Sequence, residues 1–461
     1  MTKTLPWPAD VSHTGMFRHH GAVMGAAMLG FFVVALDAQI VNVALPDIGS
    51  VLDGDLTDLQ WIVTAYTLTF SVLILLAGTV SDRLGARHSY VVGMLVFALA
   101  SALCGAAPNL AVLVAARVLQ GLGAALVAPT SLSLIREGIP DAKDRTRALG
   151  TWAVGGSLAA VAGPLLGGVL TQISWRLIFW VNLPVAAVAL ALALRTPASP
   201  RSRAPFDVIG QACSLVTLGT FTFAVIEGPR FGWSDPVIVG LLVLSAASGL
   251  AFWASLSRVA HPMIPPNLFA LREVSVALTV AFASMAAFYL VIFVQSLYFQ
   301  TERGQDALTT GLLFLPMTAV VTIVSTFAGG LIERFGTRPL VVVGLVVQAL
   351  GVVALASLPA DVAVWWVSGA MVAVGLGGSL TVPPIASIVM ENASPSLAGT
   401  SSGVLNASRQ LGGSLGVAVV GAIVASHANF DTGLRIGLVS VAAVLAASAL
   451  TSLALRQQHT S

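Results

Sequence analysis

Charge is scarce in this chain. Asp, Glu, Lys and Arg make up 9% of its 461 residues, whereas soluble domains carry roughly 25%. Lysine is nearly absent, and neither Lys3 nor Lys143 follows a glycine-rich loop. The sequence therefore offers no phosphate-binding loop for ATP. A net charge of +2 also leaves no basic surface for nucleic acid.

Cysteine is equally scarce. Cys104 and Cys213 both lie inside apolar runs, which excludes a disulfide framework and a zinc cluster. The apolar runs also lack the paired acids, metal-ligand clusters or Ser/His/Lys sets that an intramembrane enzyme requires. We therefore expect a protein that is not an enzyme and that binds no metal and no cofactor. Loops too short for a signalling domain disfavour a receptor.

Long apolar runs dominate what remains. Hydrophobic residues make up 57% of the chain, and the mean hydropathy is +0.92. Because about 20 apolar residues cross a bilayer as a helix, the runs predict an all-α polytopic membrane protein with fourteen transmembrane helices. The expected spans are 21–45, 58–80, 88–107, 110–135, 147–171, 175–194, 206–226, 236–257, 272–299, 308–331, 338–358, 362–389, 400–425 and 433–455.

The distribution of basic residues predicts the orientation. If both termini are cytoplasmic, the inner segments hold sixteen of the 22 Lys and Arg residues and the outer loops hold four. Arg117 and Arg409 fall within spans. Basic residues concentrate on the cytoplasmic side of membrane proteins. We therefore expect a multi-pass protein of the cell membrane with both termini in the cytoplasm.

Two loops predict an internal repeat. GTVSDRLGARH (Gly78 to His88) and GGLIERFGTRP (Gly329 to Pro339) share the spacing of Gly, acid, Arg, Gly and Arg at an offset of 251 residues. The alternative is two unrelated basic turns of similar composition. The repeat predicts two six-helix bundles with two helices inserted between them. The expected organisation is a cytoplasmic tail (1–20), a first bundle (21–195), a linker with two inserted helices (196–257), a second bundle (258–456) and a cytoplasmic tail (457–461).

Five further motifs carry a family resemblance. They are ALDAQIVNVALPDI (35–48), VAARVLQGLGAAL (114–126), GGSLAAVAGPLLGGVL (155–170), SWRLIFWVNLP (174–184) and NASRQLGGSLG (406–416). With them the chain resembles the major facilitator superfamily, and within it the fourteen-helix drug:proton antiporter subfamily. Ala86 departs from the family loop, which usually has a basic residue there. The resemblance implies exchange of protons for small molecules by rocking of two bundles about a midplane site. We also expect a monomer.

Asp37 is the strongest candidate for proton coupling. A carboxylate at the centre of a span costs about 2.5–3.5 kcal/mol on insertion scales, so an intramembrane acid is a functional candidate. Burial favours the neutral form of a carboxyl group, as a reversible proton carrier needs. Arg117 could pair with it, and the resemblance places a proton-coupling or substrate-sensing acid at this position. The alternative is a structural polar pair between two spans.

Small residues in span 147–171 predict a close helix contact. The resemblance implies an antiporter seam in which this span packs against span 400–425, whose Ser408, Gly412 and Gly416 have the same spacing. The alternative is ordinary close packing. The predicted seam residues are Gly155, Ala159, Gly163, Pro164, Gly167 and Gly168.

The repeated loops predict a cytoplasmic latch. An acid near the N-terminus of a neighbouring helix gains about 0.3–1 kcal/mol. The resemblance implies that Asp82 contacts the start of span 400–425, and that Glu333 mirrors it at span 147–171, when the cytoplasmic side closes. The alternative is charges that only anchor the topology. The latch residues are Gly78, Asp82, Arg83, Gly85, Arg87, Glu333 and Arg334.

Aromatic residues predict the substrate cavity, because aromatic faces bind flat lipophilic cations. The candidates are Trp61, Tyr66, Phe282, Tyr289, Phe293 and Gln295. Each could equally be an ordinary core or lipid-facing residue. Glu227 precedes Gly228 and Pro229, which favours an outer-loop carboxylate. Arg409 could extend to the headgroups or pair across the seam.

Together these features predict a proton-coupled antiporter that exports lipophilic, cationic or neutral small molecules. Its partners would be protons, the substrate and the lipid bilayer, without ATP or nucleic acid. The alternative is a narrow-specificity exporter of an antibiotic or other metabolite with the same mechanism. The Gly163-Pro164 pattern disfavours uptake by symport.

Overall fold

The computed structural model describes residues 13–453 and 455, with gaps at 140, 200–206, 260–261, 263, 265–267, 269–270, 360, 393–397 and 454. The predicted C-terminal tail and most of the predicted linker lie outside the described residues. Within the described part all regular secondary structure is helical. The elements are α1 (His13–Leu52), α2 (Leu56–Leu84), α3 (Ala86–Ala106), α4 (Leu110–Gly138), α5 (Ala142–Thr171), α6 (Leu177–Trp180), α7 (Asn182–Ala193), α8 (Val208–Phe231), α9 (Pro236–Arg258), α11 (Arg272–Leu297), the π-helix η1 (Tyr298–Glu302), α12 (Ala307–Thr326), α13 (Ala328–Phe335), α14 (Thr337–Ser357), α15 (Val364–Asn392), α16 (Ala398–Ala425) and α17 (Phe430–Ser452).

The prediction of an all-α membrane protein is confirmed. Thirteen helices in the described part are long and apolar enough to cross a membrane. The segment expected to be the sixth span is a shorter apolar helix, Leu177–Ala193, with a break at Val181. Several helices begin at an Asp or Asn whose side chain accepts a backbone N–H of the first turn, as a solvated helix start requires. These caps are Asp55, Asn109, Asp141, Asp207, Asp235, Asp306 and Asn429.

Two helices continue through a proline beyond the predicted ends of their spans. α1 continues through Pro46 to Leu52, and α8 continues through Gly228 and Pro229 to Phe231. Proline removes one backbone donor, whereas ending a helix in lipid exposes several unpaired backbone groups. Continuing the helix is therefore the smaller cost within an apolar environment.

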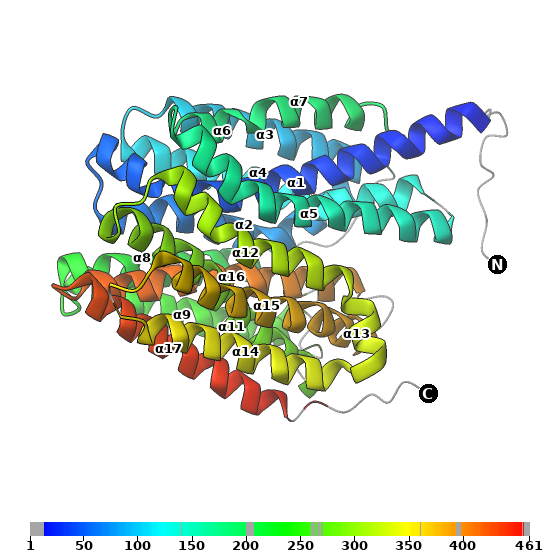
Figure 1. Cartoon of the computed structure of the whole chain (residues 1–461). Coiled ribbons are helices and arrows are strands. Elements are labelled where there is room, and N and C mark those ends of the chain that lie inside the picture. The colour runs from blue at the N-terminus through cyan, green and yellow to red at the C-terminus, as the bar shows by residue number, and fades with distance from the viewer. Residues whose placement is uncertain are drawn as a thin grey trace.

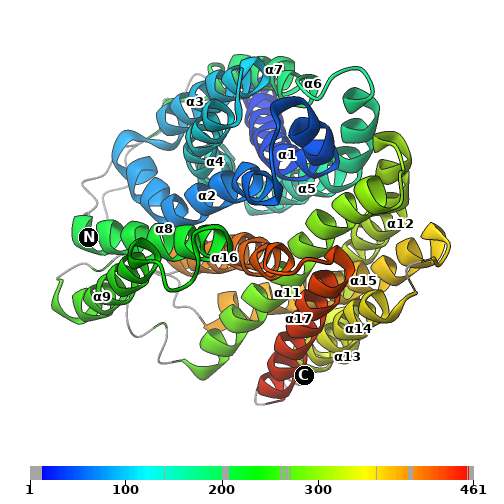
Figure 2. The same ribbon diagram turned by 90° about the vertical axis from the view of Figure 1, so that its left-hand side faces the viewer.

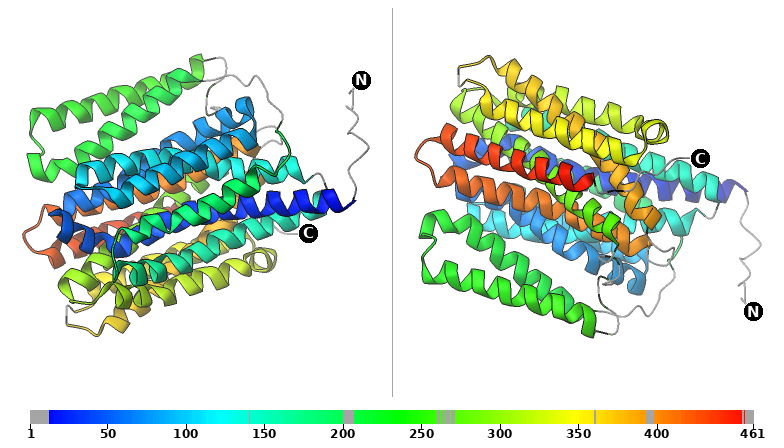
Figure 3. Two further views of the ribbon diagram at one scale, coloured as in Figure 1. Left: turned by 90° about the horizontal axis from the view of Figure 1, so that it is seen from above. Right: turned by 90° about the horizontal axis from the view of Figure 1, so that it is seen from below.

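The helices form two side-by-side groups (Figure 1). Helices α1–α7 make the N-terminal group and α11–α17 the C-terminal group. α1 begins and α17 ends on one side of the molecule, which we call the terminal end; the opposite side is the distal end. The α8–α9 hairpin packs against α2 and α16, at one edge of the molecule in Figure 2 and in both views of Figure 3. α8 therefore contacts both groups.

The two groups meet along α2–α16, α5–α12 and α1–α11. At α5–α12 the backbones are in direct contact. A Cβ atom on Gly168 would lie 2.7 Å from the Ala307 carbonyl oxygen, and one on Gly311 would collide with the Pro164 carbonyl oxygen. Near the distal end of α11, Ser296 Oγ donates to the Asn42 carbonyl oxygen of α1 at 2.6 Å.

The predicted seam between spans 147–171 and 400–425 was wrong. In α5, Gly155, Gly163 and Gly167 contact α1, and Ala159 is fully buried. In α16, Cβ atoms on Gly412 and Gly416 would collide with α11. Small residues determine that a helix approaches a neighbour closely, but they do not identify that neighbour. The seam-forming partner of α5 in the other group is α12.

The α5–α12 contact yields a stability prediction. We expect Gly311→Ala to destabilise the purified protein by about 1–3 kcal/mol, because the added methyl group meets the rigid Pro164 carbonyl oxygen. Gly329→Ala is the matched control, since a Cβ atom there meets nothing within 4 Å. Thermal unfolding in detergent measures both variants, and equal melting temperatures would contradict the close contact.

Candidate functional site

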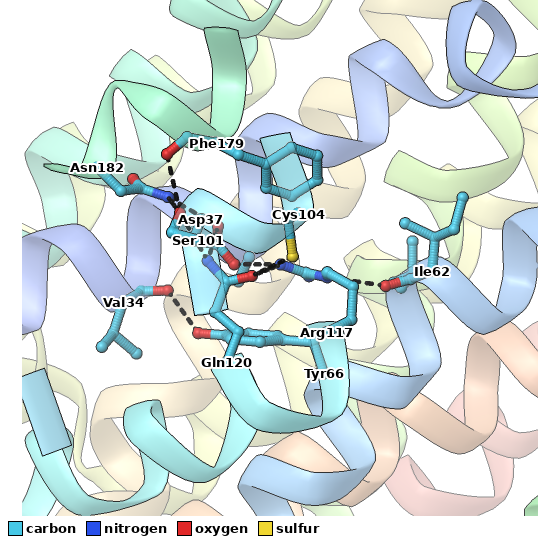
Figure 4. A network of polar contacts seen from close by, with 12 residues as sticks. Val34, Asp37, Ile62, Tyr66, Ser101, Cys104, Arg117, Gln120, Phe179 and Asn182 are labelled. Carbon is cyan, nitrogen blue, oxygen red and sulfur yellow. Dashed lines mark hydrogen bonds and ion pairs between the residues drawn. The ribbon is translucent and has the colours of Figure 1, made fainter. Parts of the chain in front are cut away.

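A buried ion pair lies at the centre of the N-terminal group. Asp37 of α1 and Arg117 of α4 are joined through Oδ2 and Nη1, and both side chains are completely buried (Figure 4). The sequence singled out these two residues because they are charged within apolar spans, and the structure brings them together.

Two amides complete the hydrogen bonds of the carboxylate. Asp37 Oδ1 accepts from Gln120 Nε2 at 2.7 Å and from Asn182 Nδ2 at 2.9 Å. Asp37 therefore receives three donors from α4 and α7. Donors around a carboxylate stabilise its ionised form. In this conformation the carboxyl group is held by one cation and two amides.

Arg117 is held as firmly as its partner. Its Nε donates to the Ile62 carbonyl oxygen of α2 at 3.0 Å, and its Nη1 also donates to Gln120 Oε1 at 2.8 Å. The guanidinium carbon lies 4.3 Å from the centre of the Tyr66 ring, within cation–π range. Tyr66 is in turn fixed by a bond from its hydroxyl to the Val34 carbonyl oxygen at 3.0 Å.

A serine on α3 supports the two amides. Ser101 Oγ accepts from Gln120 Nε2 at 3.2 Å and from Asn182 Nδ2 at 3.0 Å, and it donates to the Phe179 carbonyl oxygen at 2.8 Å. The site therefore connects α1, α2, α3, α4 and the α6–α7 segment. Moving α1 relative to α4 would break several of these bonds together.

Sequence analysis did not identify Ser101, Gln120 or Asn182. Gln120 follows Arg117 by three residues and so lies on the same side of α4. Asn182 is a polar residue within an apolar run. An amide inside a span needs hydrogen-bond partners, and this signal could have found both.

The predicted cavity residues lie at several contacts between helices, and Tyr66 and Tyr289 share one hydrophobic cluster. Tyr66 belongs to the ion-pair site, whereas Trp61 faces α8 and donates from Nε1 to Glu227 Oε1 at 2.8 Å. Phe293 and Gln295 are buried in the C-terminal group. Tyr289 lies against α16, where a Cβ atom on Gly413 would be 2.8 Å from its ring. Phe282 packs at the α11–α16 contact, beside Gly412.

The repeated loops have the same backbone conformation. Gly85 and Gly336 each separate two helices, and both have positive φ, 87° and 79°. Glycine adopts this conformation at no steric cost. Among the other latch residues, Gly78 has open space at its Cα, and Arg87 donates to the Leu194 carbonyl oxygen. The remaining four, Asp82, Arg83, Glu333 and Arg334, are exposed.

The structure gives the positions of Glu227 and Arg409, for which the sequence left alternatives. The outer-loop interpretation of Glu227 was wrong, because it lies inside α8 and is 8% exposed. Arg409 lies within α16 and donates from Nη1 to Asn406 Oδ1 of the same helix at 3.4 Å.

Similarity to known proteins identifies the chain as a multi-pass membrane transporter of small molecules. The sequence profile of the Major Facilitator Superfamily matches residues 27–417, and the chain belongs to this family. The nucleoside transporter NupG has the same fold, with a TM-score of 0.68 at 11% identity over 94% of this chain and 99% of NupG.

Two relatives are named for drug or antibiotic resistance. The multidrug resistance protein Stp of Mycobacterium tuberculosis is 39% identical over 413 residues, which cover 87% of this chain and 75% of Stp. The methylenomycin A resistance protein of Streptomyces coelicolor is 35% identical over 424 residues, which cover 91% of this chain and 89% of that protein.

The buried pair yields a second stability prediction. We expect Arg117→Gln to cost about 3–5 kcal/mol, because it leaves the Asp37 carboxylate buried without its cation. Adding Asp37→Asn should restore most of the loss, since the unpaired charge is then removed. Thermal unfolding of the single and double variants measures this coupling.

Arg147→Gln is the matched control for that experiment. It breaks the Arg147–Asp144 pair, whose side chains are 68% and 49% exposed, and exposed pairs contribute about 1 kcal/mol or less. Additive losses in the Asp37/Arg117 double variant would contradict the pairing.

Proposed function

We propose that the protein is a proton-coupled antiporter that exports lipophilic small molecules from the cell. It would belong to the fourteen-helix drug:proton antiporters, in which the shorter helix Leu177–Ala193 is the sixth span and the other thirteen spans are the long helices. It would work as a monomer. The resistance names of the two relatives support export of drugs or antibiotics. With both termini cytoplasmic, as the distribution of basic residues favours, the distal end faces outward.

The observation that carries the proposal is the buried Asp37–Arg117 pair. Protonation of Asp37 removes the charge that neutralises Arg117, and a buried unpaired charge costs about 3–5 kcal/mol. The protonated site therefore favours a different packing of α1 against α4. Loss of the proton restores the pair. A proton thus selects between two conformations, which is what coupling requires.

Contacts within the two groups support alternating access by a rocking motion. α5 packs on α1 in the N-terminal group, and α16 packs on α11 in the C-terminal group. The matching turns at Gly85 and Gly336 add to this correspondence. We propose that residues 21–195 and 258–456 are the rocking units, with residues 196–257 as an inserted linker and hairpin.

The exposed Asp82 fits a latch that is open in this conformation. Among the described residues, no hydrogen bond or ion pair holds Asp82 at the terminal end. Closing the cytoplasmic side would bring Asp82 to the start of α16 and Glu333 to the start of α5, where helix N-termini attract negative charge. The latch would stabilise the outward-open state.

The contacts of Asp37 constrain the charge that a substrate can carry. Asp37 is fully engaged by Arg117, Gln120 and Asn182. A cationic substrate that used this carboxylate would have to displace Arg117, whereas a neutral lipophilic compound would not. We therefore propose neutral or monovalent cationic substrates, with Tyr66 and Tyr289 as aromatic contacts.

The central test is efflux from cells preloaded with ethidium. We expect rapid efflux by the wild-type protein that stops when a protonophore is added. Asp37→Asn should reduce efflux to the level of cells without the protein, at equal expression, because the site can no longer exchange a proton. Asp361→Asn, an exposed acid in a distal loop, is the control and should transport normally. Unchanged efflux by the Asp37 variant would refute the proposal.

A growth panel distinguishes broad from narrow specificity. Cells expressing the protein would be challenged with ethidium, a set of lipophilic drugs and methylenomycin A, the antibiotic named for one relative. Protection against many compounds supports multidrug export. Protection against one compound supports the alternative, a narrow exporter with the same proton coupling.

A further inference from the structure

A second carboxyl group lies within the membrane-spanning helices. Glu227 of α8 is 8% exposed. Its Oε1 accepts a hydrogen bond from Trp61 Nε1 of α2 at 2.8 Å, and its Oε2 is buried without a hydrogen-bond partner in the described structure. Unlike Asp37, it is not paired with a cation among the described residues.

The surroundings of Glu227 are apolar. Val225 and Ile226 of α8 cluster with two alanines of α16, Ala418 and Ala422, and with Trp61. The charged groups on α8 and on the helices packed against it cap helix ends, are exposed to solvent, bond within their own helix or lie at the terminal end. They are Asp55 and Asp58, which cap α2, Asp235, which caps α9, the exposed Arg230 and His427, Arg258 at the terminal end of α9, Asp82 and Arg83 at the terminal end of α2, and Arg409 beside Asn406.

These contacts leave one oxygen of the Glu227 carboxyl group, Oε2, able to hold a proton. An unpaired carboxylate in an apolar environment favours its neutral form, whereas the N–H of Trp61 stabilises the ionised form. A proton requires no cavity, so it can occupy Oε2 in the packing observed here. The geometry suits a proton better than a larger ligand.

The position of Glu227 connects this protonation to both helix groups. α8 contacts α2 and α16, which belong to different groups. One residue before Trp61, the amide of Gln60 packs directly on Gly421 of α16, where an added Cβ atom would collide with it. Separation of α2 from α16 at the distal end would therefore hydrate Glu227, and hydration favours its ionised form.

We propose that Glu227 is a second proton-binding site, which links the inserted α8–α9 hairpin to the transport cycle. A proton from the outside neutralises Glu227 and thereby favours the conformation in which the distal end is closed. The site regulates the cycle and does not replace Asp37. This inference rests on the proposed antiport function.

Ethidium efflux measured against external pH, at a fixed internal pH, tests the site. Glu227→Gln fixes the side chain in a neutral form, so we expect efflux to continue and to keep only the dependence on external pH that the proton gradient imposes through Asp37, without the midpoint contributed by Glu227. Trp61→Phe removes the donor that stabilises the ionised carboxylate. We therefore expect its efflux midpoint to move to higher pH by about one unit.

Two variants serve as controls. Trp233→Phe alters an exposed tryptophan that packs on Gly228, and Glu302→Gln alters an exposed acid at the same end. Both should keep the wild-type pH profile. A merely structural role of Glu227 would change the amount of folded protein and the rate but not the midpoint.

The outcomes separate this inference from the proposed function. A wild-type profile in Glu227→Gln, or an unshifted midpoint in Trp61→Phe, overturns the second site while leaving antiport intact. Wild-type efflux that ignores external pH and protonophore overturns both. If Glu227→Gln does not fold, the Trp61→Phe midpoint decides the matter.

Discussion

The structure depends on keeping one carboxylate and one guanidinium out of water. The idealised cost of moving such an ion into an apolar medium is on the order of 20 kcal/mol, and several kcal/mol remain after relaxation. Asp37 and Arg117 offset this cost by pairing and by bonds to Gln120, Asn182 and the Ile62 carbonyl oxygen. The close packing of the N-terminal helices and the glycine-mediated approach of α5 to α1 hold these groups in register.

Much of this architecture could be predicted from the sequence, because the membrane imposes strong rules. Apolar runs gave the spans, and a charge within a span is rare enough to single out Asp37 and Arg117. Gln120 and Asn182 were not predicted as site residues because amides are uncharged, and whether they bond to Asp37 depends on the folded geometry. The partner of α5 could not be predicted, because a small-residue face fits any close neighbour. Glu227 was misplaced because the helix continues through Pro229.

The two buried acids differ in a way that suits different tasks. Asp37 has a cation and two amide donors, so separating it from these partners must rearrange the site. Glu227 has a single indole donor and one unpartnered oxygen. A proton on that oxygen would therefore require little rearrangement of its neighbours. The first arrangement fits the proposed coupling of transport to protons, and the second fits adjustment of that cycle.

Proton release on substrate binding tests the central claim most directly. Purified protein in weakly buffered detergent solution would be mixed with ethidium while the pH is recorded. The account predicts that binding releases protons from the wild-type protein and that Asp37→Asn binds ethidium without releasing them. Equal proton release by the wild-type protein and the Asp37 variant would contradict the assignment of coupling to this site.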